Sequence, residues 1–298
     1  MGNRKYLFFD FDGTVFEGKK YAPETVAAMR KAQAAGYWLI LNTGRSQGHF
    51  DATPEGKACP IRWDARIYGM SDIVIGERAV QRIALGAEKA MQWAVYAREN
   101  GIQFWLEGQK RIVKFPFHDP ELRGKIGSDR ELREAMDADT VTKVILIAEY
   151  DDQNAPKGDW TVHTDRGWFE VTVRDRQKGS AIRDFCRLTG TDLADCVCFG
   201  DAFNDLDMFR TCPVGICMKA APKELSDLAA YHATGEHGVA EGIEWLLERE
   251  KSEKRLDKQE KSGYNRNTSQ KNGGAMVSTG ILTHDKRGEP GKLDNCPT

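Results

Sequence analysis

Two aspartates near the start of the chain have the spacing of a nucleophile and its acid/base partner. The apolar segment 6–9 is followed by Asp10 and Asp12, and then directly by Gly13 and Thr14. Side chains alternate along a strand, so the two aspartates are expected to point the same way at the carboxyl end of a buried parallel strand. One carboxylate there can attack while the other moves a proton. Gly13 suits a sharp turn close to a small anion, although Asp-Gly also occurs in ordinary acidic turns.

Three more polar features follow expected strands or begin expected helices. Thr43 follows the apolar segment 37–42, Lys178 precedes a helical segment, and Asp201 follows the apolar segment 196–199. Each has an ordinary explanation, respectively a turn, a solvated lysine and a helix cap. Their order and their expected place at one edge of a parallel sheet favour a phosphoryl-transfer site instead. Such a site needs an in-line nucleophile, cations for the phosphate oxygens and a proton donor.

Alternating strands and helices predict an α/β domain that a differently built segment interrupts. Residues 23–36 have the proline start and glycine stop of a helix, and the apolar segments on either side predict a parallel strand pair. A further strand is expected at 65–68. Between about residues 74 and 173, helices mix with several extended segments, which indicates an α+β insert. The alternation then resumes and continues to a final helix at 239–249.

Four segments together resemble the motifs of the haloacid dehalogenase superfamily. They read FFDFDGTV, NTGR, QKGSAI and FGDAFNDLDMF, and the insert between the second and third resembles the Cof-type, C2B-capped branch (subclass IIB). The match covers roughly residues 5–248. The resemblance implies a Rossmann-like parallel-sheet core formed by residues 1–73 and 174–249. It also implies an inserted α+β cap domain at 74–173.

The resemblance also implies a role for each matching residue. Asp10 would attack phosphorus, and Asp12 would donate a proton to the leaving alcohol and later activate water. A Mg²⁺ ion would be held by Asp10, the backbone carbonyl of Asp12 and Asp201. Phe203 is bulkier than the family's usual residue, and it either faces the substrate entrance or packs. The remaining implied roles are water orientation by Asp205, phosphate binding by Thr43, Lys178 and Asn204, and substrate specificity from Gly44 and Arg45.

The function expected from this set is Mg²⁺-dependent hydrolysis of small phosphate monoesters, with sugar phosphates among the candidates, through a phosphoaspartate. A phosphomutase or another phosphotransferase on the same scaffold is the first alternative. A signalling or phosphometabolite-binding protein without catalysis is the second, because receiver domains also combine acidic residues with a threonine and a lysine. Receiver domains lack the large insert and the DxDGT spacing.

Composition limits the partners. The 298 residues carry a net charge of −2, but the segment from Arg249 onward has eleven Lys and Arg against seven Asp and Glu, so the rest of the chain is acidic. An acidic body argues against nucleic acid as a partner. The tail 250–298 has many charges and few large apolar residues, and is expected to be disordered. A small phosphorylated metabolite is the expected partner, and the oligomeric state stays open.

Cysteine usage and hydropathy bear on the compartment. Seven cysteines, an odd number without CxxC pairs, fit a reducing environment and core packing better than disulfides or a zinc site. No apolar segment approaches the roughly 18 residues needed to span a membrane. The sequence therefore predicts a cytoplasmic enzyme.

Overall fold

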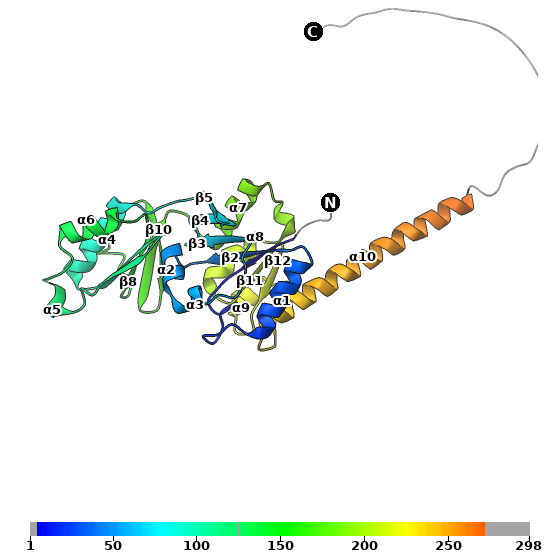
Figure 1. Cartoon of the computed structure of the whole chain (residues 1–298), viewed down its shortest axis with the longest axis horizontal. Helices are drawn as coiled ribbons and strands as arrows, with labels where there is room; N and C mark the ends of the chain where they lie inside the picture. Colours follow the sequence, from blue (N-terminus) through cyan, green and yellow to red (C-terminus); the bar gives the residue numbers. More distant parts are fainter. Residues whose placement is uncertain (1–4, 124, 272–298) are drawn as a thin grey trace, which may run out of the picture. The chain divides into compact units, whose positions relative to one another are not determined.

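An eight-stranded sheet is the central element of the computed structural model, which describes residues 5–123 and 125–271 (Figure 1). The strand order is β13-β12-β11-β1-β2-β3-β4-β5. Neighbouring strands from β13 to β3 are parallel, whereas β4 and β5 join antiparallel. The α/β prediction with a parallel sheet is confirmed. The strand bounds are Tyr6–Phe9 (β1), Trp38–Thr43 (β2), Ala65–Tyr68 (β3), Asp72–Ile75 (β4), Arg78–Gln81 (β5), Cys196–Gly200 (β11), Val214–Cys217 (β12) and Tyr231–His232 (β13).

Strand β1 is buried on both faces, as its apolar sequence requires. Leu7 and Phe9 belong to one hydrophobic cluster, and Phe8 belongs to another, where its ring meets that of Phe185 edge-on at 5.4 Å. Alternate residues of the strand thus support helices on opposite faces of the sheet. The elements around the sheet are α1 (Pro23–Ala34), α2 (Gln47–Ala52), α3 (Pro54–Lys57), α7 (Lys178–Thr189), η1 (Leu193–Asp195), η2 (Phe203–Asp205), α8 (Leu206–Thr211) and α9 (Lys223–Ser226). The last helix is α10 (Gly238–Lys271), whose residues up to Glu248 belong to the same compact unit as the sheet.

A second sheet is antiparallel and lies within the predicted insert. Its strand order is β7-β6-β8-β10-β9, and it has its own hydrophobic cluster, in which the Trp93 and Phe169 rings meet at 5.8 Å. Strands β4 and β5 still belong to the first sheet, so the second sheet begins at β6. The domain limits at residues 74 and 173 stay a prediction. The elements are α4 (Ala87–Asn100), β6 (Gln103–Gly108), β7 (Ile112–Phe115), α5 (Pro120–Arg123), α6 (Asp129–Asp137), β8 (Val141–Ile147), β9 (Trp160–Asp165) and β10 (Trp168–Val173).

The C-terminal segment differs from the expectation. Residues up to Glu248 form one compact unit, and a second unit begins at Arg249. Helix α10 continues to Lys271. The sequence instead predicts that this helix ends near residue 249 and that a disordered tail begins at 250. Residues after 249 are rich in Glu, Lys, Arg and Gln, which favour helix, and Arg249 pairs with Glu253 one turn on at 2.9 Å. The predicted tail beyond 271 lies outside the described residues.

Both edges of the eight-stranded sheet are short. Strand β13 has two residues, and β5 has four, of which Arg78 and Ala79 are exposed. The pairing of β4 with β5 is irregular between Ile73 and Val74. Among the described helices, none combines the length and apolar character needed to cross a membrane.

Candidate active site

The sheet topology brings the predicted site residues to one edge. Strand β1 lies between β2 and β11, and Phe9 is in register with Leu41 on one side and Phe199 on the other. All three strands are parallel, so the residues that follow them emerge together at their carboxyl ends. The Asp10 amide donates to the Phe199 carbonyl at 3.0 Å and keeps this residue against β11. Asp10 and Thr43, both buried, thus lie near the loop that carries Asp201.

Lys178 is the first residue of α7 and lies completely buried beside the carboxylates. Its Nζ donates to Asp10 Oδ1 at 2.5 Å and to Asp205 Oδ1 at 2.6 Å. Burial alone would lower the pKa of Lys178, but Asp10 and Asp205 outweigh burial and raise it above its usual value. The side chain therefore supplies a fixed positive charge next to the predicted nucleophile.

Three carboxylates gather around that lysine. One oxygen each from Asp10, Asp201 and Asp205 lie within 4.8 Å of one another. Burial raises the pKa of Asp10 well above its usual value, and the neighbouring carboxylates add to this effect; burial also raises the pKa of Asp201. One ammonium does not balance three carboxylates, so the cluster suits a further cation. Carboxylate oxygens are the ligands that Mg²⁺ prefers, and the residues present fit that ion.

Asp205 differs from the other two carboxylates in its contacts. Its Oδ2 accepts hydrogen bonds from the Asp201 amide at 2.9 Å and the Ala202 amide at 3.1 Å, while Oδ1 accepts from Lys178. Both Asp205 oxygens therefore already accept hydrogen bonds, although one of them lies close enough to the Asp10 and Asp201 oxygens to share a metal ion. Because these hydrogen bonds occupy both of its oxygens, Asp205 positions the loop and Lys178, and Asp10 and Asp201 are the better candidate ligands.

The residues after Asp12 hold Asp201 in place. Thr14 Oγ1 donates to Asp201 Oδ1 at 2.8 Å. Gly13 has φ +83°, and a Cβ added there would lie 2.1 Å from Asp201 Oδ2. The glycine is therefore required both for the left-handed turn and for the close approach of the aspartate. Thr14 belongs to the sequence motif, but the sequence analysis assigned it no role. The hydrogen bond from its hydroxyl to Asp201 is a supporting contact that sequence reasoning missed.

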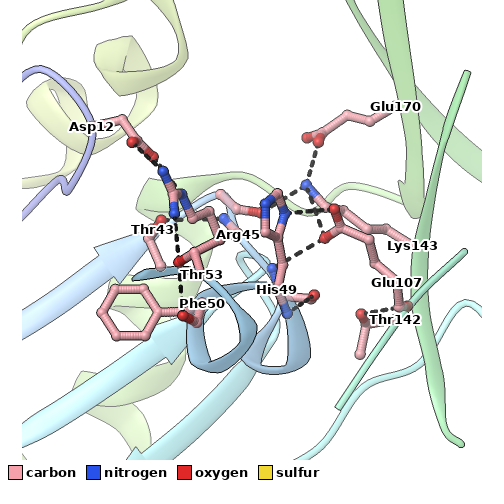
Figure 2. Close-up of polar contacts among 12 residues, drawn as sticks. Asp12, Thr43, Arg45, His49, Phe50, Thr53, Glu107, Thr142, Lys143 and Glu170 are labelled. Carbon is pink, nitrogen blue, oxygen red and sulfur yellow. Dashed lines mark hydrogen bonds and ion pairs between the residues drawn. The ribbon is translucent and has the colours of Figure 1, made fainter. Parts of the chain in front are cut away.

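The Asp12 carboxylate faces the guanidinium of Arg45 (Figure 2). Arg45 Nε donates to Asp12 Oδ2 at 2.8 Å and Nη2 to Oδ1 at 2.6 Å, while Nη1 donates to Glu55 Oε1 at 2.7 Å. Burial alone would lower the pKa of Arg45, but the hydrogen bonds and charge of Asp12, together with Glu55, raise it. The charge of Arg45 is thus balanced by two carboxylates. Its role in substrate specificity stays a prediction.

The predicted phosphate-binding residues lie around the same loops. Thr43 Oγ1 accepts from the Arg45 amide at 3.1 Å, and Asn204 Oδ1 is 3.5 Å from Lys178 Nζ. Gly44 and Asn204 also line a cavity of about 540 Å³ that is bounded on another side by residues of β9 and β10. A second hollow, of about 750 Å³, lies beside Asp12. Residues of the insert therefore share a cavity with the predicted phosphate site.

A buried group of charges joins the insert to the loop after β2 (Figure 2). Lys143 on β8 donates to the Gly44 carbonyl at 2.8 Å and to Glu170 on β10, and it lies 3.9 Å from Glu107 on β6. Burial alone would lower the pKa of Lys143, but Glu170 and Glu107 raise it. Lys143 thus fixes the backbone position of Gly44.

Glu107 makes the second link to this loop. It accepts from the Ser46 amide at 3.3 Å and pairs with His49 Nδ1 at 2.7 Å. Burial would raise the pKa of Glu107, but Lys143, His49 and Ser46 lower it to about 2. Sequence reasoning missed this group. The available signal was one charged residue inside each of three mostly apolar strands, at Glu107, Lys143 and Glu170.

Comparisons with known proteins agree with this arrangement. A family model described as haloacid dehalogenase-like hydrolase matches residues 7–243. A phosphoglycolate phosphatase of Archaeoglobus fulgidus is 26% identical over 83% of this chain and 98% of its own length.

Solved structures share the fold. A haloacid dehalogenase subclass IIB sugar phosphatase is 21% identical, with a TM-score of 0.63 over 81% of this chain and 98% of the other. A haloacid dehalogenase-like hydrolase from Bacteroides thetaiotaomicron is 19% identical, with a TM-score of 0.66 over 82% and 99% of the two chains. The prediction of a Rossmann-like core with a cap is confirmed.

Proposed function

The chain belongs to the haloacid dehalogenase-like hydrolase family and is a phosphatase of that family, and from this premise we propose that it cleaves small phosphate monoesters with Mg²⁺ through a phosphoaspartate on Asp10. The observation that supports the proposal best is the position of Asp10. It is buried, it contacts the Lys178 ammonium at 2.5 Å, and its carboxylate lies in one cluster with Asp201. A nucleophile, a fixed cation and a candidate metal site thus coincide.

The proposed reaction proceeds in two displacements. A carboxylate oxygen of Asp10 forms a bond to phosphorus while the bond from phosphorus to the leaving oxygen breaks, and Asp12 donates its proton to that oxygen. The Asp12 carboxylate then takes a proton from water, whose oxygen attacks phosphorus and releases Asp10. Asp12 has to leave its ion pair with Arg45, at least in part, to reach the substrate.

The other residues stabilise charge on the phosphoryl group. Thr43, Lys178 and Asn204 would donate hydrogen bonds to its nonbridging oxygens. Asp10, Asp201 and the Asp12 carbonyl would hold Mg²⁺, with Asp205 supporting the loop. When bound, the ion supplies positive charge that favours the ionised form of Asp10 and screens the incoming phosphate.

Phosphate release from p-nitrophenyl phosphate and a panel of phosphorylated metabolites tests the proposal. We expect release with Mg²⁺, none after chelation, and recovery when the metal is restored. Asp10→Asn should lower kcat by at least roughly a thousandfold, because the amide is a poor nucleophile. The matched control is Asp64→Asn, a carboxylate that bonds to the Leu39 amide at 2.9 Å, outside the site. Wild-type activity in Asp10→Asn, or full activity without metal, would contradict the mechanism.

The same assay separates hydrolysis from transfer. Free phosphate should account for the substrate consumed when a second sugar alcohol is added in excess. Phosphate found mainly on the added sugar would favour a phosphotransferase. A phosphoenzyme that persists for hours after substrate removal would favour a regulatory protein.

A further inference from the structure

One peptide group of the loop after β2 is held at both of its polar atoms. The Gly44 carbonyl accepts a hydrogen bond from Lys143 Nζ at 2.8 Å. The Arg45 amide donates to Thr43 Oγ1 at 3.1 Å. This carbonyl and this amide belong to the same planar peptide group, in which they point in opposite directions. The position of the Lys143 ammonium on one side therefore sets the direction of the amide hydrogen on the other.

That amide hydrogen decides what the Thr43 hydroxyl can do. Thr43 is buried at the end of β2, beside the strand that leads to Asp10. A hydroxyl oxygen that accepts a hydrogen bond directs its own hydrogen elsewhere. Phosphoryl oxygens are negatively charged acceptors, so a residue that binds them has to donate. The Arg45 amide thus leaves the Thr43 hydroxyl in the state that phosphate binding requires.

Lys143 is suited to hold the peptide group in one orientation. It is buried on β8, between β6 and β10, and its ammonium pairs with Glu107 and Glu170 on these two strands (Figure 2). A buried ammonium that moved away from its carboxylates would leave charges without partners, which costs free energy. A hydrogen bond from an ammonium to a carbonyl is also stronger than one between neutral groups. The contact with Gly44 is therefore firm.

Glu107 holds the next peptide group of the loop in a similar way. It accepts from the Ser46 amide at 3.3 Å, and the Arg45 carbonyl of the same peptide group accepts from the Gly69 amide at 2.8 Å. Lys143 is thus one peptide group away from the Thr43 hydroxyl, whereas Glu107 is two away. An effect of the insert on Thr43 should accordingly depend on Lys143 first.

Resting on the proposed function, we propose that Lys143 is a positioning residue for phosphate binding: it orients the peptide group that follows Gly44 and thereby keeps the Thr43 hydroxyl as a donor to the phosphoryl group. Lys143 is not among the described residues that line the neighbouring cavity, so it acts through the peptide group. The insert would then contribute to the affinity for the phosphoryl group itself, independently of the leaving group.

The inhibition constant of inorganic phosphate tests the proposal, because this ion has no leaving group to contact the insert. It is measured as competitive inhibition of p-nitrophenyl phosphate hydrolysis by the full chain with Mg²⁺. Lys143→Met should raise the constant roughly three- to tenfold, and Thr43→Val, which removes the hydroxyl, roughly tenfold. Adding Lys143→Met to Thr43→Val should change it by less than about twofold, since Lys143 acts through the hydroxyl.

Additive effects of the two substitutions would overturn the proposal, because they would mean that Lys143 acts independently of the hydroxyl. An unchanged constant in Lys143→Met would also overturn it. Arg98→Met is the control: Arg98 on α4 likewise donates to a backbone carbonyl of the insert, that of Gly127 at 2.7 Å, and pairs with a carboxylate. It should leave the constant within about twofold, and a rise equal to that in Lys143→Met would show a general disturbance of the insert instead.

A second variant covers a failure of Lys143→Met to fold. Lys143→Met combined with Glu170→Gln removes one positive and one negative charge together, and the same limits apply to it. If this variant does not fold either, Lys143 is required for the fold and the proposal is overturned. An active wild type in which Lys143 and Thr43 are not coupled would contradict this proposal alone, whereas a wild type without hydrolysis would contradict the proposed function as well.

Discussion

Gly13 shows how a single backbone position controls the site. Its left-handed conformation costs any other residue about 1–2 kcal/mol, and its missing side chain leaves room for Asp201 Oδ2 at 2.1 Å from the place of a Cβ. Two requirements, one of conformation and one of space, therefore meet in one residue. The aspartate they accommodate is the candidate metal ligand that Thr14 also holds.

The Gly13→Ala variant should distinguish an effect on metal binding from a general effect on the free energy of unfolding. We expect the Mg²⁺ concentration for half-maximal activity to rise roughly 10- to 100-fold, because the added methyl displaces Asp201. The matched control is Gly36→Ala, which has φ +93° but nothing within 4 Å of the added Cβ. Both variants should lose the free energy of unfolding that the left-handed conformation costs an alanine, and Gly13→Ala should lose more because its methyl also clashes with Asp201. An equal loss of Mg²⁺ affinity in Gly13→Ala and Gly36→Ala would show that backbone strain, and not the displacement of Asp201, is responsible.

At the scale of elements, three strands of the insert place charged side chains against the loop after β2. Strands β6, β8 and β10 contribute one each, and they are neighbours in the second sheet. Glu107 is fully buried, and its pKa is lowered from the usual 4.5 to about 2. The unfolded chain therefore binds a proton at this residue before the folded chain does as the pH falls.

Stability should depend on pH through Glu107. Its contribution is fully present above about pH 4.5 and is lost as the pH falls through about 2, and it amounts to the order of 3 kcal/mol. Urea unfolding between pH 3 and 6 should show a steeper loss in the wild type than in Glu107→Gln, which cannot titrate. If the free energy of unfolding falls with pH equally steeply in the wild type and in Glu107→Gln, Glu107 is not responsible for the pH dependence of stability.

The extent of prediction also varied by element. Strand β1 and the motif residues at its end could be predicted from the local sequence, since an apolar segment followed by D-x-D-G-T is typical of a buried strand that ends in a tight turn. Lys143 could not be placed, because its partners lie on β6 and β10 and depend on the pairing of distant strands. The Arg45 pair with Glu55 was missed for a similar reason: it depends on where the short helix α3 begins.

At the scale of the whole molecule, the candidate site needs only the first compact unit. The predicted catalytic, phosphate-binding and metal-binding residues lie between Asp10 and Asp205, and the family model ends at residue 243. A chain that ends at Lys271 should keep kcat/KM within about twofold of the full chain. Steady-state kinetics on p-nitrophenyl phosphate measures this directly. A loss above about tenfold with unchanged unfolding would give the last residues a catalytic role.

The short edges of the eight-stranded sheet have a consequence for behaviour at high concentration. An exposed strand edge offers unpaired amide and carbonyl groups to other chains. Here one edge strand has two residues, and the other begins with an exposed arginine and joins the sheet irregularly. Neither edge presents a long, flat, apolar template. The eight-stranded sheet is thus protected against edge-to-edge aggregation by the same strands that terminate it.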